Sequence, residues 1–211
     1  MQYIMLPYFM NQIRTYLLII ILSGLSLSSF SQSAAETAAY QKTVQQRAVK
    51  IVGKLGITDS AAAIRVRDII AAHYSELNTI YTKRDSGKLS PADADLAVSR
   101  LHQPFLTKLA ADLNADQIVQ VKDGLTYGVL PITYTAYQDM LPQLSTEQKN
   151  QILIWLTEAR EKAMDAESSE KKHGWFKKYK GRINNYLSAA GIDMKKEGEA
   201  WQDRIRARAK K

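Results

Sequence analysis

The stretch Leu144-Ser145-Thr146-Glu147-Gln148 has the form of a helix start: an apolar residue, a capping residue, and then acids or amides in the next turn. The Ser145 hydroxyl can accept a hydrogen bond from an unpaired N–H of the first turn, and Glu147 favours the positive end of the helix dipole. Gln148 lies three residues after the cap, where its side chain can close a capping box. The stretch therefore predicts a helix that begins after Ser145.

The same pattern occurs three times upstream, in Ile57-Thr58-Asp59, Leu89-Ser90-Pro91-Ala92-Asp93 and Leu113-Asn114-Ala115-Asp116-Gln117. Apolar residues at helical spacing follow each start, and no stretch shows the sustained alternation of paired strands. The caps are irregularly spaced, which argues against a repeat protein. The sequence predicts an all-α fold, a single irregular bundle of six or seven helices in one domain over residues 32–211.

Residues 1–31 have the composition of a secretory signal peptide. Arg14 is their only charged side chain; it precedes the apolar run of residues 16–22, and small residues surround a cleavage site near Ser31/Gln32. The apolar run is shorter than the roughly 20 residues that span a bilayer, which disfavours the alternative of a membrane anchor. We expect a secreted or periplasmic protein that has no transmembrane segment after cleavage. Met10 is an alternative start of the chain.

The composition limits which interactions can stabilise an exported chain of this kind and which partners it can bind. The sequence has no cysteine, which excludes a disulfide scaffold, a lipid-modified cysteine and a thiol nucleophile. The net charge of +8 is concentrated at the C-terminal end, where residues 171–211 hold 13 Lys and Arg against 4 Asp and Glu. This asymmetry indicates an anionic partner, although a solvated basic tail is the commoner explanation.

Residues 123–142 depart from a clean helical pattern because they contain two glycines and two prolines. Tyr134 and Tyr137 lie within them. The faces of such rings can pack against the C–H face of a sugar while neighbouring polar groups meet its hydroxyls. Alternatively, the two tyrosines, three residues apart, form one face of a helix that packs into the core.

Residues 158–187 interleave lysines with aromatic residues, a combination that suits phosphates with stacked bases or acidic sugars. Four further residues add polar groups: Arg182 adds a fork of donors, Asn184 and Asn185 add two amides, and Tyr186 adds a ring. The predicted export argues against nucleic acid as the partner. The alternative is that the lysines form a solvated face and the aromatic residues pack inward.

Known catalytic patterns are mostly missing: there is no GxSxG, HExxH or phosphate loop. His73, His102 and His173 fall on different predicted helices without the spacing of metal ligands, so we expect no metal site and no cofactor. Glu158, Glu161 and Asp165 offer carboxylates for acid/base chemistry, although Glu158 and Glu161 stand in a stretch typical of a solvated ion-pair face.

The string KYKGRINNYL (residues 178–187), with the preceding stretch of residues 158–165 and Lys172-His173, resembles a family of exported bacterial proteins. That family is classed as a domain of unknown function and described as sugar-binding. The resemblance would cover nearly all of the mature chain, and the string is its most specific part. It implies a secreted or periplasmic helical domain found beside polysaccharide-degrading proteins, with no established reaction.

The leading hypothesis is a carbohydrate-binding protein of the periplasm or cell exterior, for fragments of an acidic polysaccharide. Arg182 and Lys180 would meet carboxylates, the two asparagines would meet hydroxyls, and the tyrosines would stack. The predicted ligand-binding residues are Tyr134, Tyr137, Arg160, Lys180, Arg182, Asn184, Asn185 and Tyr186. The alternatives are a glycan-processing hydrolase or lyase that uses a Tyr, His173, Arg182 or a carboxylate, and an interaction module of the cell envelope. No oligomeric state is predicted.

Overall fold

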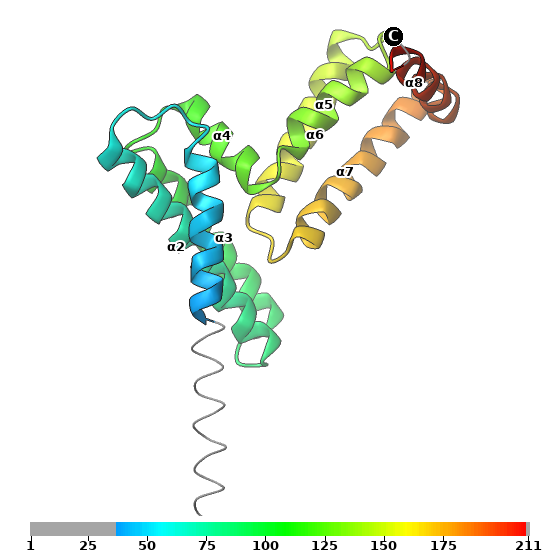
Figure 1. Cartoon of the computed structure of the whole chain (residues 1–211). Coiled ribbons are helices and arrows are strands. Elements are labelled where there is room, and N and C mark those ends of the chain that lie inside the picture. The colour runs from blue at the N-terminus through cyan, green and yellow to red at the C-terminus, as the bar shows by residue number, and fades with distance from the viewer. Residues whose placement is uncertain (1–36, 210–211) are drawn as a thin grey trace, which may run out of the picture. The chain divides into compact units, whose positions relative to one another are not determined.

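The computed structural model describes residues 37–209 (Figure 1). Eight helices and no strand occur among these residues, which confirms the all-α fold and adds one helix to the upper predicted number. The predicted signal peptide and its cleavage site near Ser31 lie outside the described residues. None of the helices in the described part is long and apolar enough to cross a membrane.

The helices follow one another with short connections. After a first helix over residues 37–52, the chain forms α2 (Ser60–Asp85), α3 (Pro91–Leu109), α4 (Ala115–Leu125), α5 (Val129–Met140), α6 (Thr146–Met164), α7 (Ser169–Ala189) and α8 (Met194–Arg208). Residues 47–209 belong to one compact unit, and residues 37–46 belong to another. All the sites described below lie within the first of these.

Side-chain caps begin the helices, largely as predicted. Asn114 and Ser145 each accept a hydrogen bond from the third helical N–H, and the amides Gln117 and Gln148 complete two capping boxes. At α2, however, the cap is Asp59 instead of the expected Thr58. Asp59 is closer along the chain to the second helical residue, Ala61, and its carboxylate accepts a hydrogen bond from the N–H of that residue at 2.8 Å.

The main difference from the predicted elements is α5, which occupies most of the segment expected to depart from helix. A turn separates α4 from α5, and both Tyr127 (φ 59°) and Gly128 (φ 67°) adopt left-handed backbone there. Pro131 falls in the first turn of α5, where an N–H has no helical partner in any case, and Pro142 follows the C-cap. The prolines therefore border this helix and do not break it.

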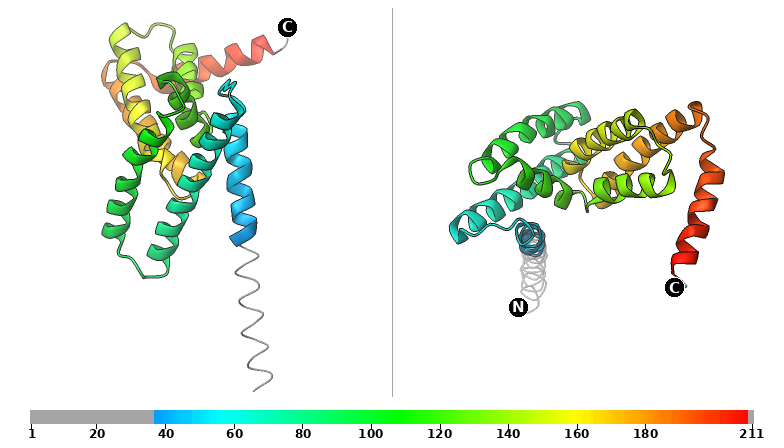
Figure 2. Two further views of the ribbon diagram at one scale, coloured as in Figure 1. Left: turned by 90° about the vertical axis from the view of Figure 1, so that its left-hand side faces the viewer. Right: turned by 90° about the horizontal axis from the view of Figure 1, so that it is seen from above.

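The main core lies between α5, α6 and α7. Figures 1 and 2 show α6 and α7 side by side along most of their length, with α8 near the end of α7. The buried core residues are Leu130, Tyr137, Leu141, Leu144, Ile152, Leu156, Ala159, Ala163, Phe176, Tyr179, Ile183 and Leu187. Helices α2 and α3 form a separate hairpin, whose side chains reach the loop between α6 and α7.

Candidate functional site

A carboxylate, Asp165, lies inside the protein at the C-cap of α6, with only 7% of the residue exposed. Its Oδ1 is 2.9 Å from His73 Nε2, and its Oδ2 is 2.6 Å from His102 Nδ1. The Tyr81 hydroxyl donates to the backbone carbonyl of the same residue at 2.8 Å. Since His73 and Tyr81 belong to α2 and His102 belongs to α3, both helices of the hairpin contact α6 at this residue.

Hydrogen bonds determine the ionisation states of Asp165 and His102. Burial alone would raise the pKa of Asp165, but the hydrogen bonds from His102 and His73 outweigh it and lower that pKa. An ionised carboxylate only accepts, so both histidines donate to it. Hydrogen bonds to Asp165 and Glu161 raise the pKa of His102 to about 9, against the effect of its burial. His102 is therefore an imidazolium at neutral pH.

Glu161, one helical turn before Asp165, extends the network toward α4. Its Oε2 lies 3.4 Å from His102 Nε2 and 2.7 Å from Lys122 Nζ. Burial would raise the pKa of Glu161, but hydrogen bonds from His102 and Lys122 lower it to about 2. Charges removed from water in this way stabilise a fold only when each has its partner. The network therefore fixes the positions of both carboxylates and of His102.

A buried lysine supports the same end of α6. Lys172 is 4% exposed, and its Nζ donates to the carbonyls of Met164 at 2.6 Å and Ala163 at 3.2 Å. Burial lowers the pKa of Lys172 to about 8, although the charge of Asp165 acts against this. A cation at the last carbonyls of a helix satisfies groups that have no helical partner and favours the negative end of the dipole. Lys172 thus holds the turn that carries Asp165.

A cleft of about 630 Å³ opens beside the network and exposes part of it. This volume is typical of a pocket for a small ligand. Helices α2, α3, α6 and α7 and the α6–α7 loop all contribute to it. Its lining includes the cations Arg84, His102, Lys162 and Lys171, the carboxylates Asp95, Glu161, Asp165 and Glu167, and the indole of Trp175. The cleft therefore combines two aromatic side chains, Tyr81 and Trp175, with equal numbers of cationic and anionic side chains at neutral pH.

Contacts at the rim orient several of these groups. The Arg84 guanidinium binds Glu167 and lies 4.9 Å from the centre of the Tyr81 ring. Across the cleft, Lys162 Nζ lies 5.5 Å from the centre of the Trp175 ring. Exposed cation–π contacts of this kind contribute only about 0.5–1 kcal/mol, so they orient a side chain without fixing it.

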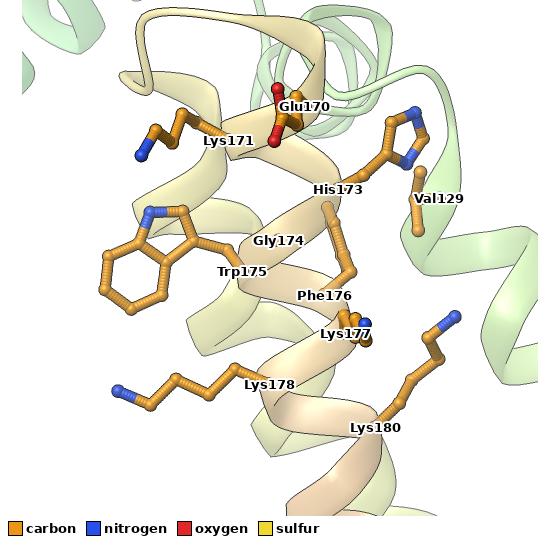
Figure 3. A pocket seen from close by; sticks show the side chains of 10 residues that line it. All are labelled: Val129, Glu170, Lys171, His173, Gly174, Trp175, Phe176, Lys177, Lys178 and Lys180. Carbon is orange, nitrogen blue, oxygen red and sulfur yellow. The ribbon is translucent and has the colours of Figure 1, made fainter.

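A second hollow, of about 810 Å³, borders the first half of α7. Figure 3 shows that its lining side chains project in different directions: Lys171, Trp175 and Lys178 lie on one side of α7, and His173 and Lys180 lie on the other. A helix thus stands between the two halves of the lining. This hollow does not enclose a single ligand, so we regard the cleft beside Asp165 as the better candidate.

The predicted ligand-binding residues fall into separate groups. Tyr137 is 6% exposed, and its hydroxyl donates to Asn184 Oδ1 at 2.6 Å. Tyr134 packs, half-buried, against the same core. Arg160 is 6% exposed, with Nη1 2.9 Å from Asp123 Oδ1. These three side chains make contacts inside the protein, as the alternative interpretation of the tyrosines anticipates.

The other predicted residues lie on α7, where Tyr186 is partly buried and the rest are exposed. The Arg182 guanidinium stacks 4.4 Å from the centre of the Trp155 ring and lies 3.5 Å from Glu158. Tyr186 packs edge-on against Trp155 at 5.3 Å between ring centres. Lys180 and Asn185 are exposed, and Lys180 projects to the side of α7 opposite Trp175 (Figure 3). The structure brings Arg182 and Tyr186 together but places Lys180 away from them.

Sequence reasoning missed the residues that converge on Asp165. His73 and His102 precede it by 92 and 63 positions, so no local motif connects them. One signal was present: His73 lies between Ile70 and Leu77 on the buried face of α2. A histidine on an apolar face needs a polar partner. Within residues 37–209, no three His, Asp or Glu side chains are arranged to hold a metal ion.

Fold and site together define an all-α domain built around a buried histidine–carboxylate network with an adjoining cleft. The chain belongs to the family described as protein of unknown function (DUF3826), which matches residues 41–96 and 88–207. The matched residues include every helix that contributes to the network. The resemblance inferred from residues 158–187 is thereby confirmed as to the family, and the sugar-binding description stays a prediction. No curated protein matches the chain.

Proposed function

We propose that the protein binds carbohydrate in the cleft beside Asp165. The observation that carries the proposal is the mixed lining, in which the Trp175 indole stands beside cations and carboxylates in equal number. The C–H face of a sugar ring packs against an indole, while its hydroxyls accept from cations and donate to carboxylates. A lining without excess charge suits a polyhydroxylated ligand. The predicted export would place this activity outside the cytoplasm.

The hydrogen-bond network orients side chains of the cleft before such a ligand binds. Asp165 holds the His102 ring at Nδ1, and Lys122 holds Glu161 at 2.7 Å. Because these groups are already oriented, a ligand that contacts them loses less free energy to side-chain ordering. Lys162 and Lys171 are exposed and can adjust to ligands of different shape.

Calorimetric titration against a panel of neutral and uronic-acid oligosaccharides tests the proposal. We expect Trp175→Ala to weaken binding about tenfold, because an aromatic contact contributes roughly 0.5–1.5 kcal/mol beyond the area it buries. Lys180→Ala, on the opposite side of α7, is the matched control and should leave affinity unchanged. The absence of heat from every member at millimolar concentration, with both variants folded by circular dichroism, would contradict the proposal.

His102 favours one alternative, cleavage of a glycan. As an imidazolium it can donate a proton to a departing oxygen, while the ionised Glu161 can accept one from water. However, His102 Nε2 and Glu161 Oε2 are only 3.4 Å apart, whereas the two catalytic groups of glycosidases are about 5–9.5 Å apart. The geometry therefore favours binding. Turnover of the same panel, abolished in His102→Asn while binding persists, would establish the alternative.

A further inference from the structure

Beyond the cleft, one face of α7 continues as a row of cations and aromatic rings. Its α7 members follow one another at intervals of three or four residues and so share one side of the helix. They are Lys171, Trp175, Lys178, Arg182 and Tyr186. Figure 3 shows the first three projecting to the same side. We call this face, with the α6 residues that meet it, the cation–aromatic row.

Helix α6 supplies the other half of the row: Trp155, Glu158 and Lys162. Lys162 and Lys178 place their Nζ atoms 5.5 and 5.3 Å from the centre of the Trp175 ring. Farther along, Arg182 stacks on Trp155. The row therefore follows the α6–α7 pair away from the cleft with three rings, of which Trp175 is contacted by two lysines and Trp155 by Arg182 and Tyr186.

The row begins inside the cleft, because Lys162, Lys171 and Trp175 line both. Its charge differs from that of the cleft, however. The row holds four cations against a single carboxylate, Glu158, whose side chain is 46% exposed. A ligand that extends from the cleft along α7 thus passes from a balanced environment to a positively charged one. Charge complementarity along this path calls for an anionic ligand.

Arg182 is the cation of the row that contacts both a ring and a carboxylate. Its guanidinium is held against the Trp155 indole and beside Glu158, and 54% of the side chain remains exposed. Such a planar fork binds a carboxylate or sulfate through two hydrogen bonds. Arg182 comes seven residues after Trp175, about two helical turns or roughly 10 Å along the axis. One sugar ring on Trp175 does not reach that far.

We propose that the row binds an extended acidic oligosaccharide, one end of which occupies the cleft. This inference rests on the proposed function, because the cleft anchors the chain. One ring packs on Trp175, and carboxylates or sulfates farther along the chain pair with Lys178 and Arg182. The two lysines that cover the indole turn toward these anions at little cost, since an exposed cation–π contact contributes only about 0.5–1 kcal/mol.

A calorimetric series of oligogalacturonates with two, four and six sugar units, alongside their methyl-esterified counterparts, tests the proposal. The esters keep the rings and remove the charge. We expect affinity for the acids to rise about tenfold from the dimer to the hexamer and to fall with added salt, whereas the esters show no such rise. Arg182→Met should remove the rise and leave dimer binding intact. Lys177→Met, on another side of α7, is the matched control.

The outcomes separate this proposal from the proposed function. If the dimer binds but affinity does not rise with chain length, or if the rise persists in Arg182→Met, the row does not bind the oligosaccharide. The cleft would then remain as the sugar site. Loss of binding to every saccharide overturns both. Competition for the hexamer by single-stranded DNA or by phosphatidylserine vesicles at equal charge concentration also overturns the row, because it would then be a general polyanion surface.

Discussion

The cleft and the cation–aromatic row share three residues, yet they hold their charges in opposite ways. In the cleft, Asp165 and Glu161 are partly or fully buried, and each has histidine or lysine partners within hydrogen-bonding distance. In the row, the cations are exposed and outnumber the carboxylates, and Lys178 and Arg182 contact rings. Buried charge must be balanced, and balancing it fixes geometry; exposed excess charge attracts ligands over distance but is screened by salt. Shape selectivity should therefore reside in the cleft and charge selectivity in the row.

The largest effect should come from breaking the network at its centre. Asp165→Asn replaces a carboxylate that accepts from two histidines with an amide that must turn its NH₂ toward one of them. We expect the free energy of unfolding to fall by about 3–5 kcal/mol, as for other buried pairs that lose one partner. Urea denaturation measures this loss.

Asp203→Asn is the control for that variant, because Asp203 forms an exposed ion pair with Arg206 on α8. Its effect should stay within about 0.5 kcal/mol. Equal effects of the two substitutions would show that the network around Asp165 contributes no more than a surface ion pair.

The pH dependence of stability should identify His102 as a charged member of the network. Its pKa of about 9, above the ordinary 6.5, means that its contribution is complete below about pH 6.5 and is lost as pH rises through 9. The carboxylates that face it, Asp165 and Glu161, stay ionised throughout this range. Lys172 acts in the opposite direction: its lowered pKa of about 8 adds stability between pH 8 and its ordinary 10.5.

Comparing the protein with His102→Gln separates the two contributions, because Lys172 is present in both. The difference in their free energies of unfolding, from urea denaturation at pH 6 to 10, should shrink as pH rises through 9. A difference that is constant across this range would mean that His102 is not an imidazolium in the folded state.

Alanine substitutions at two glycines compare a tightly packed position with an open one. A Cβ on Gly124, next to the Arg160 partner Asp123, would lie 2.8 Å from Ile51 Cγ1, whereas a Cβ on Gly181 of α7 would meet nothing within 4 Å. Gly124→Ala should therefore destabilise the protein by about 1–3 kcal/mol. Gly181→Ala should stabilise it by about 0.5–1 kcal/mol, because glycine is unfavourable inside a helix. Thermal melts of the two variants measure both, and effects of the same sign would contradict the packing described.

The smallest effect concerns the predicted residues inside the core. Tyr137→Phe removes the hydrogen bond to Asn184 and should lower the free energy of unfolding by about 0.5–1.5 kcal/mol. Saccharide affinity should not change, because this pair lies outside the cleft and the row. A loss of saccharide affinity with an unchanged free energy of unfolding would show that Tyr137 and Asn184 belong to the ligand site.

Local chemistry made the helices predictable from the sequence. The boxes at Asn114 and Ser145 depend on side chains three residues apart, so they can be recognised without the fold. The buried face was harder to predict: Ile64 and Leu96 stand at helical spacing with other apolar residues, yet they are 51% and 49% exposed. Helical spacing defines a face, but neighbouring apolar positions such as Val66 and Ile70 define a competing one, and tertiary packing selects between them.

The candidate site was only partly predictable. The interleaved cations and rings of α7 are local, so the sequence alone could single out Arg182 and Tyr186 as candidates; their role in ligand binding stays a prediction. The network could not be found in this way, because its members come from α2, α3, α4 and α6 and meet only when those helices pack. Asp165 looked like one more carboxylate on a charged helix until the fold placed two histidines against it.

The three tryptophans provide the most direct test of the central claim, that the cleft binds sugar and the row extends the site for acidic chains. Their indole ¹⁵N–H resonances report on the cleft (Trp175), the row (Trp155) and a distant site where Trp201 donates to Asp139 at 2.6 Å. A neutral disaccharide should shift only the Trp175 signal, and an acidic hexasaccharide should shift Trp175 and Trp155 together. Unchanged Trp175 and Trp155 signals in the presence of both ligands, or shifts confined to Trp201, would contradict the account.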